Sequence, residues 1–282
     1  MVTPFATAGA TGHAAAAMPS PPPPSFNARL DAAIDREGSL LCVGLDPRME
    51  RLEEPIEDFC RRIIDATIHA AVAFKPNSAF FEQLGVKGWQ ALEIVVRHIG
   101  GARVVILDAK RGDIGPTAEA YAHAAFRALG VDAITVNPYL GGDAVLPFLA
   151  DPERGGFILC HTSNPGAQDF QTLPIDGRPL YLHVAERVAA AWNGADNAGL
   201  VLGATYPDAL EAVRERAPRL PFLVPGIGAQ GGDLGAALAA GLDANGRGLV
   251  INSSREIVYA GDPADAALRL RDAINAARAR YR

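Results

Sequence analysis

The sequence predicts an α/β protein that folds as a single (β/α)8 TIM barrel with a disordered N-terminal tail. Residues 26–282 match the ~250 residues typical of such a barrel. Within them, about eight short apolar runs alternate with longer amphipathic segments. The runs are apolar throughout, as expected for parallel strands that are buried on both faces of a sheet. A closed barrel is the simplest arrangement of this pattern, and a doubly wound open sheet is the alternative.

The first 25 residues differ in composition from the rest of the chain. They are rich in Ala and Pro, contain no Lys, Arg, Asp or Glu, and include consecutive prolines at positions 21–24. We expect this segment to be disordered, and Met18 offers an alternative start of translation. It lacks the charged start of a signal peptide and the arginines of a transit peptide. The expected organisation is a tail at 1–25 and a barrel domain at 26–282.

The predicted strands are apolar runs that precede polar or Gly-rich residues. They are residues 40–45, 72–75, 103–109, 133–136, 157–161, 200–204, 222–224 and 248–251. Apolar residues with a period of about 3.6 predict helices between them, such as 116–129 and 180–192. Pro116 suits the first turn of the former helix, and Gly130 suits its end. The repeated strand–helix order favours a parallel sheet with right-handed crossovers.

The charge balance limits the kinds of partner. Asp plus Glu outnumber Lys plus Arg by 32 to 26, so the net charge is −6 and no overall basic field is available to hold nucleic acid. A small anion remains a possible ligand, because one phosphate needs only local N–H groups and a single Arg to bind it. No stretch approaches the ~20 apolar residues of a membrane span. We therefore expect a soluble protein that binds neither nucleic acid nor membranes.

Cysteine and histidine usage argues against disulfides and metal binding. Cys42, Cys60 and Cys160 are an odd number, widely spaced, and form no CxxC pair. The six histidines show no HExxH or other spacing typical of metal ligands. We expect a protein of the reducing cytoplasm with no metal site.

Lysine is rare in this chain. Only three of the 26 basic residues are lysines, namely Lys75, Lys87 and Lys110. An ammonium can give up its proton whereas a guanidinium stays protonated, so a lysine kept in an Arg-rich chain is a candidate for proton chemistry. Lys87 lies in a Gly-flanked polar turn and suits the surface. Lys75 and Lys110 therefore become the candidates.

Charged residues cluster at the ends of two neighbouring predicted strands. Asp108 and Lys110 are two residues apart, so both side chains point to the same face, at the mouth of the barrel. A structural salt bridge is the plain interpretation of that pair. Lys75 ends the preceding strand, and two ammonium groups in one mouth require further negative charge or a polyanionic ligand. Asp46 and Asp113 could supply the charge, although Asp113 could instead cap the helix near residue 116.

A Gly-rich segment follows the seventh predicted strand. Gly226-x-Gly228-x-x-Gly231 matches the GxGxxG pattern, but a dinucleotide fingerprint opens the first βαβ unit and is followed by an acidic residue about 20 residues later. Here the next strand ends in Asn252, so we reject that interpretation. The loops after strands seven and eight commonly bind phosphate in barrels, and Gly N–H groups with Arg255 suit a monophosphate. A Gly-rich turn with a surface arginine is the alternative.

Ser163 and Gln230 are uninformative alone, because Ser163 also suits a helix cap. No serine lies in a GxSxG elbow, and no Cys and His are placed suggestively, so covalent hydrolase chemistry has no support.

Four segments together resemble one enzyme family. Residues 108–114 resemble the DxKxxDI signature of the orotidine 5′-phosphate decarboxylases, and residues 74–77, 162–166 and 225–233 resemble its other blocks in the same order. Related sugar-phosphate enzymes share DxKxxD alone, whereas the four blocks together are far more specific. The resemblance covers roughly residues 38–260 and is greatest to the longer bacterial branch of the family. It implies decarboxylation of orotidine 5′-monophosphate to UMP, without a cofactor, in pyrimidine synthesis.

The resemblance also implies roles for the charged residues. Lys75, Asp108, Lys110 and Asp113 would form an alternating charged array, with Lys110 as the proton donor and Lys75 also contacting ribose hydroxyls. In the family, the residues that match Asp113 and Thr117 enter the site of the partner subunit. We therefore expect a homodimer.

The remaining matched residues would bind the nucleotide. Asp46 would hold ribose hydroxyls, Ser163 would contact the pyrimidine edge, and Gln230 would bridge the base and the phosphate. Arg255 would bind the phosphate with nearby backbone N–H groups, including that of Gly228. The segment 252–255 reads Asn-Ser-Ser-Arg in place of the commoner Gly-Arg pair, so Arg255 is the least typical of these matches.

Two alternatives remain open from the sequence. A Mg²⁺-dependent 3-keto-hexulose 6-phosphate decarboxylase or hexulose-phosphate synthase would use the same DxKxxD frame. A non-catalytic barrel that binds a phosphate ligand would need no proton donor. Ser163 and Gln230 favour the nucleotide, and Lys110 disfavours a protein that only binds its ligand.

Overall fold

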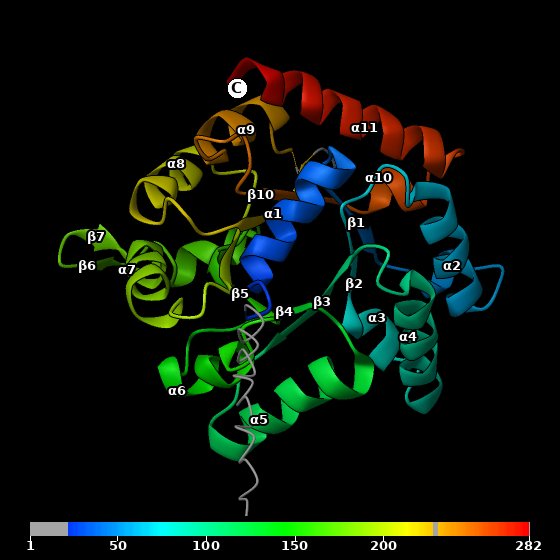
Figure 1. Cartoon of the computed structure of the whole chain (residues 1–282), viewed down its shortest axis with the longest axis horizontal. Coiled ribbons are helices and arrows are strands. Elements are labelled where there is room, and N and C mark those ends of the chain that lie inside the picture. The colour runs from blue at the N-terminus through cyan, green and yellow to red at the C-terminus, as the bar shows by residue number, and fades with distance from the viewer. Residues whose placement is uncertain (1–21, 228–230, 282) are drawn as a thin grey trace, which may run out of the picture.

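A computed structural model describes residues 22–227 and 231–281. Within them, eight parallel strands close into a barrel in the order β1-β10-β9-β8-β5-β4-β3-β2 (Figure 1). The pairing of β1 with β10 closes the sheet, so the predicted barrel is confirmed and the open sheet is wrong. The strands are β1 (Leu41–Leu45), β2 (Ala73–Pro76), β3 (Val104–Arg111), β4 (Ala133–Val136), β5 (Gly155–His161), β8 (Ala198–Leu202), β9 (Phe222–Pro225) and β10 (Leu249–Ser253).

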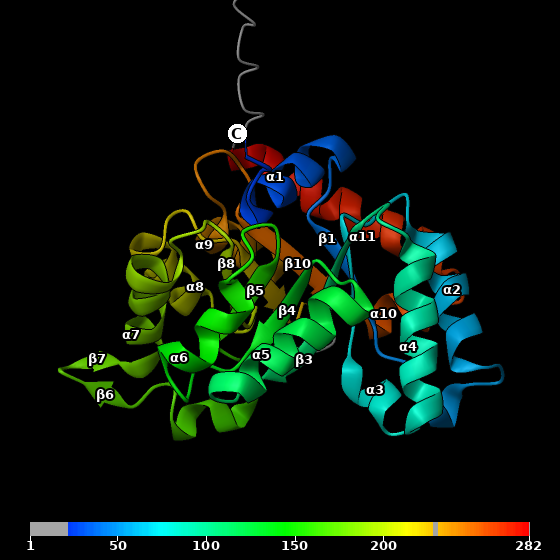
Figure 2. The same ribbon diagram turned by 60° about the horizontal axis from the view of Figure 1, so that its bottom comes forward.

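The boundaries of all eight predicted strands lie within two residues of the observed ones. Helices surround the barrel, as Figures 1 and 2 show. They are α1 (Phe26–Glu37), α2 (Ile56–Thr67), α3 (Ser78–Glu82), α4 (Val86–Ile99), α5 (Gly115–His123), α6 (Gly142–Val145), α7 (Leu180–Arg187), α8 (Pro207–Arg216), α9 (Leu234–Gly241), α10 (Arg255–Val258) and α11 (Pro263–Arg278). Helices α5 and α7 continue as π-helical turns to Leu129 and Trp192, where the predicted helices also end.

Helix α1 lies across the N-terminal end of the barrel (Figure 2). The ring of Phe26 contacts that of Phe157 edge-to-face, with centroids 6.0 Å apart. A Cβ atom at Gly155 would lie 2.4 Å from the Phe26 ring, so only glycine lets this ring pack against β5. Ser25, which the sequence placed in the tail, caps α1 by accepting a hydrogen bond from Ala28 N at 3.2 Å. Residues 1–21 of the expected tail lie outside the described residues.

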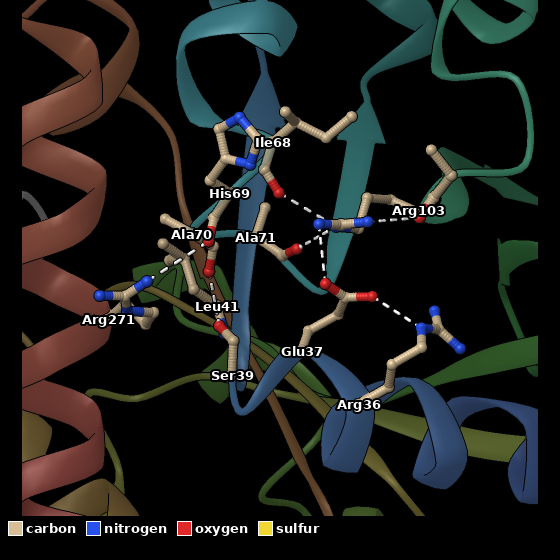
Figure 3. A network of polar contacts seen from close by, with 11 residues as sticks. Arg36, Glu37, Ser39, Leu41, Ile68, His69, Ala70, Ala71, Arg103 and Arg271 are labelled. Carbon is tan, nitrogen blue, oxygen red and sulfur yellow. Dashed lines mark hydrogen bonds and ion pairs between the residues drawn. The ribbon is translucent and has the colours of Figure 1, made fainter.

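A polar network stabilises the same end of the barrel (Figure 3). Arg103 Nε donates to the carbonyl oxygens of Ile68 and Ala71 at 3.0 and 2.7 Å, and its guanidinium pairs with Glu37 at 2.7 Å. Glu37 ends α1, so the network joins this helix to the loops that precede β2 and β3. Polar contacts at the N-terminal end of such a barrel contribute to stability, which leaves the C-terminal end for function.

A small hairpin, β6 (Pro174–Ile175) and β7 (Arg178–Pro179), extends from the barrel (Figure 2). Its turn residues Asp176 and Gly177 have φ values of +49° and +75°. Asp-Gly is the dipeptide that favours this kind of tight turn, so the sequence contained a signal for a hairpin that we did not predict.

Within the described residues, no helix is long and apolar enough to cross a membrane.

Candidate active site

A cavity of about 250 Å³ opens at the C-terminal end of the barrel. It is lined from all eight strands or from the segments that follow them. Six of the ten residues that the sequence singled out line this cavity, namely Asp46, Lys75, Asp108, Lys110, Ser163 and Arg255. The barrel therefore brings together residues that are up to about 210 positions apart in the chain.

Asp108 lies between two ammonium groups. Its Oδ2 accepts a hydrogen bond from Lys75 Nζ at 2.6 Å, and its Oδ1 accepts one from Lys110 Nζ at 2.5 Å. The side chains of Lys75 and Asp108 are only 5% and 11% exposed, whereas that of Lys110 is 49% exposed. Lys75 is thus a fixed charge in the barrel wall, and Lys110 presents its ammonium group to the cavity.

The geometry fixes the ionisation of the two buried partners. Burial acts to lower the pKa of Lys75, but the nearby carboxylates of Asp108 and Asp46 raise this pKa above its usual value. Burial acts to raise the pKa of Asp108, but the ammonium groups of Lys75 and Lys110 hold this pKa well below its usual range. Asp108 and Lys75 are therefore both charged at neutral pH.

The backbone at Lys110 is strained. Its φ of +46° lies in the left-handed region, which costs about 1–3 kcal/mol for a residue other than glycine. The pairing of β3 with β4 also changes register between Leu107 and Arg111, so the strand is irregular where it carries Asp108 and Lys110. Strain of this kind persists where the surroundings hold the backbone in place, and it is concentrated in functional sites.

Asp46 follows β1 and is held by Tyr259, the residue directly after α10. The Tyr259 hydroxyl accepts a hydrogen bond from Arg48 N at 2.6 Å and donates one to the Asp46 carbonyl oxygen at 3.3 Å. Asp46 Oδ1 is buried and has no hydrogen-bond partner among the described residues. Because a buried acceptor without a partner costs about 1–3 kcal/mol, this oxygen is suited to accept a hydrogen bond from a ligand hydroxyl.

Ser163 reaches the cavity from the loop after β5. Thr162 N donates to Gln171 Oε1 at 2.8 Å, and Gln171 Nε2 donates back to Thr162 Oγ1 at 2.9 Å, which fixes the start of this loop. A Cβ atom at Gly203 would lie 2.8 Å from the backbone nitrogen of Ser163. Glycine at position 203 therefore allows the loop to cross the end of β8 closely enough for Ser163 to line the cavity.

The segments that follow the neighbouring strands β9 and β10 also line the cavity. Gly226 has a φ of +102°, and it lines the cavity together with Ile227. Arg255 begins α10 and lines the same cavity. Gly228 and Gln230, which the sequence assigned to ligand binding, lie outside the described residues.

Asp113 and Thr117 do not line this cavity in the single chain. Helix α5 has no side-chain cap, so the alternative interpretation of Asp113 as a helix cap is wrong. Asp113 Oδ1 instead accepts a hydrogen bond from Ile114 N at 2.8 Å. Thr117 is exposed on α5.

Several polar residues of the cavity were not singled out from the sequence. Asn77, Thr162, Asn252, Ser253 and Ser254 belong to the polar segments that follow the predicted strands. Thr135 lies within a predicted strand, where a polar residue in an otherwise apolar run was the available signal. The full set is Asn77, Thr135, Thr162, Asn252, Ser253, Ser254 and Glu256.

In the part of the chain that the structure describes, no group of three or more His, Cys, Asp or Glu side chains is placed to hold a metal ion. The described cysteines are all free and buried. The polar side chains that line this cavity carry ammonium and guanidinium groups, carboxylates, hydroxyls and amides.

Comparisons with known proteins find the same family that the four sequence motifs indicated. Residues 39–270 match the model of the orotidine 5′-phosphate decarboxylase / HUMPS family. Orotidine 5′-phosphate decarboxylase of Roseiflexus sp. (strain RS-1) is 51% identical over 268 residues, which cover 90% of this chain and 98% of that protein. The enzyme of the same name from Halobacterium salinarum is 52% identical over 270 residues, which cover 89% and 98% of the two chains.

A solved structure gives the same result. The OMP decarboxylase of Leishmania donovani superposes with a TM-score of 0.84 and 49% sequence identity, and the match covers 90% of this chain and 98% of that one. Sequence, fold and cavity therefore agree, and the chain belongs to the orotidine 5′-phosphate decarboxylase / HUMPS family.

Proposed function

We propose that this chain decarboxylates orotidine 5′-monophosphate to UMP without a cofactor, in the synthesis of pyrimidine nucleotides. The observation that carries the proposal is the placement of Asp108 between Lys75 and Lys110 in the cavity, with hydrogen bonds of 2.6 and 2.5 Å. The enzymatic relatives that match over nine-tenths of the chain support the same substrate.

The decarboxylation requires a positive group close to C6 of the pyrimidine ring, because negative charge develops on that carbon. When the bond between C6 and the carboxylate breaks, CO2 leaves and the electron pair stays in an sp² orbital on C6 that the ring cannot delocalise. An ammonium group close to C6 stabilises this charge in the transition state. Lys110 then donates a proton from Nζ to C6, which forms the C–H bond of UMP, and the neutral amine regains a proton from solvent.

The neighbours of Lys110 hold its ammonium group in position. Asp108 is held ionised by two ammonium groups, so it provides a fixed negative charge beside Lys110 Nζ. Lys75 is almost fully buried and balances this charge from the barrel wall. Because the three charges are fixed before the substrate binds, little reorganisation is needed during the reaction.

The nucleotide would extend from this array across the cavity. Asp46, whose Oδ1 has no partner among the described residues, would accept a ribose hydroxyl, together with Lys75. Ser163 would bind the pyrimidine edge, and Gln230 would bridge the base and the phosphate. Arg255 and backbone N–H groups, including that of Gly228, would bind the phosphate. Phosphate binding far from C6 could supply binding energy that is expressed in the transition state.

We place Asp113 and Thr117 in the site of a second subunit of a homodimer. Ile114, directly after Asp113, is 56% exposed, and Tyr139 is 81% exposed. The two lie on adjoining segments, because Asn137 N donates to the Arg111 carbonyl oxygen at 2.8 Å. Exposed apolar side chains of this size suit a protein contact beside the cavity.

The free, buried cysteines support our proposal of a cytoplasmic enzyme.

The decisive assay mixes the purified protein with orotidine 5′-monophosphate, follows the loss of its ultraviolet absorbance, and identifies the product by chromatography. We expect conversion to UMP at equal rates with and without EDTA, because an ammonium group provides the electrostatic stabilisation. Reversible loss of activity on chelation would indicate Mg²⁺-dependent sugar-phosphate chemistry instead. Binding of UMP without turnover of orotidine 5′-monophosphate would indicate a binding protein.

A further inference from the structure

The irregular part of β3 lies opposite one residue of β4. Leu107 pairs with Ile134 and Arg111 pairs with Val136, so residues 108–110 lie opposite Thr135 alone. A regular parallel pair would place one residue there. The additional residues leave backbone N–H groups of β3 out of register with the carbonyl oxygens of β4.

The hydroxyl of Thr135 takes the place of those carbonyl oxygens. Its Oγ1 accepts hydrogen bonds from Ala109 N at 3.0 Å and from Lys110 N at 2.9 Å. It donates its proton to Asp108 Oδ1 at 3.1 Å. A hydroxyl has two acceptor positions and one donor, so these contacts use its full capacity and fix the direction of its proton.

These contacts connect Thr135 to the reacting group. Asp108 Oδ1, which accepts the Thr135 proton, also accepts the hydrogen bond from Lys110 Nζ at 2.5 Å. The backbone of Lys110 is held in the left-handed region at φ +46° by the bond from its N–H to the same hydroxyl. Thr135 is 1% exposed, so water does not compete for these bonds. One buried hydroxyl thus fixes both ends of the Lys110 side chain.

We propose that Thr135 is a positioning residue for the decarboxylation, which acts by holding Lys110 Nζ at the point where it protonates C6. The proposal rests on the proposed function. Thr135 itself need not touch the reacting atoms. Its effect should appear in the chemical step and only weakly in nucleotide binding, because the ribose and phosphate contacts come from other strands.

The test compares Thr135→Val, which has nearly the same shape but no hydroxyl, with Thr135→Ser, which keeps the hydroxyl. We expect Thr135→Val to lower kcat about 10- to 100-fold, since a misplacement of about 1 Å can cost about 100-fold. The Kd for UMP should change less than about threefold, and Thr135→Ser should keep kcat within about threefold of the wild type. Thr135→Ala provides the same test if the valine variant does not fold.

Thr67→Val is the matched control. Thr67 is also 1% exposed, but its hydroxyl donates to the Ile63 carbonyl oxygen within α2, at 2.7 Å. This variant loses a buried hydroxyl of the same size away from the cavity, so it should keep the wild-type kcat. An equal fall of kcat in Thr67→Val and Thr135→Val would show that loss of a buried hydroxyl acts through general destabilisation, and would overturn the proposal.

A double variant tests whether Thr135 acts by positioning Lys110 or has an effect of its own on kcat. If Thr135 acts through Lys110, then Lys110→Ala with Thr135→Val should have the same residual kcat as Lys110→Ala alone. A further 10-fold loss in the double variant, or wild-type kcat in both Thr135→Val and Thr135→Ala, would overturn the proposal. The wild-type assay is the separate check on the proposed function. If wild-type protein converts orotidine 5′-monophosphate, these results concern the role of Thr135 alone.

Discussion

The ammonium group of Lys75 lies 2.6 Å from Oδ2 of Asp108, and both side chains are almost fully buried. Taking two charges out of water costs several kcal/mol for each ion, so such a pair often adds little net stability compared with apolar residues of the same volume. Here Asp108 also positions a second ammonium group, because its Oδ1 accepts a hydrogen bond from Lys110 Nζ. The pair is therefore better explained by the chemistry of the cavity than by the stability of the barrel.

Asp108→Asn should lower the free energy of unfolding at pH 7 by about 3 kcal/mol, because it leaves Lys75 buried without its carboxylate. The folded-state pKa of Asp108 is below the unfolded value of about 3.9. Its stabilisation is therefore complete above that value and is lost as the pH falls toward the folded-state pKa. Urea unfolding at several pH values should show a constant difference from the wild type between about pH 5 and about pH 7 and a smaller one near pH 3.

Asp65→Asn is the control for this experiment. Asp65 is 67% exposed and pairs with His98 on the surface, so its loss should change stability by less than about 0.5 kcal/mol. A difference between wild type and Asp108→Asn that stayed the same down to pH 3 would refute the assignment of a low pKa to Asp108.

Arg255→Ala should weaken substrate binding more than catalysis. Loss of a hydrogen bond to a charged phosphate corresponds to about a 10- to 100-fold rise in KM. Arg269→Ala is the control, because Arg269 is an exposed arginine that pairs with Asp265 within α11. Steady-state kinetics of both variants provide the measurement. If the KM of Arg255→Ala were that of the wild type, another group near residues 252–255 would have to bind the phosphate.

A subunit-mixing experiment tests the shared site. Homodimers of Lys110→Ala and of Asp113→Ala should each be nearly inactive, but their heterodimer would contain one site with both residues intact. With random exchange, about half of the dimers are heterodimers with one good site of two, so activity should reach roughly a quarter of the wild type. The measurement is kcat per total protein before and after co-refolding. No gain after confirmed subunit exchange would place Asp113 in its own chain's site.

The fold could be predicted because it depends on repeated local patterns. Apolar runs and amphipathic segments alternate along the chain, and polar or Gly-rich residues follow each predicted strand. The positions of Lys75, Asp108 and Lys110 in one cavity followed from strand periodicity and from the rule that strand ends meet in a barrel. In the structure, both ammonium groups lie within hydrogen-bond distance of the Asp108 carboxylate.

The details that depend on register could not be predicted. Nothing in the strand pattern indicates that β3 carries additional residues opposite Thr135, or that Lys110 adopts a left-handed backbone. Both result from pairing between strands, which period-two patterns do not resolve. The roles of Asp113 and Thr117 stay predictions, because they depend on a second subunit. Those of Gly228 and Gln230 stay predictions because they lie outside the described residues.

In the proposed reaction, Lys110 protonates the carbon from which CO2 leaves. The most direct test measures release of labelled CO2 from carboxyl-labelled orotidine 5′-monophosphate by the wild type, Lys110→Ala, Lys110→Arg and the exposed-lysine control Lys87→Ala. We expect normal release by Lys87→Ala and a fall of about 100- to 10,000-fold in both Lys110 variants, because guanidinium is too weak an acid to replace the ammonium group. UMP should still bind to both Lys110 variants. Release by Lys110→Ala at the wild-type rate would show that Lys110 is not the proton donor.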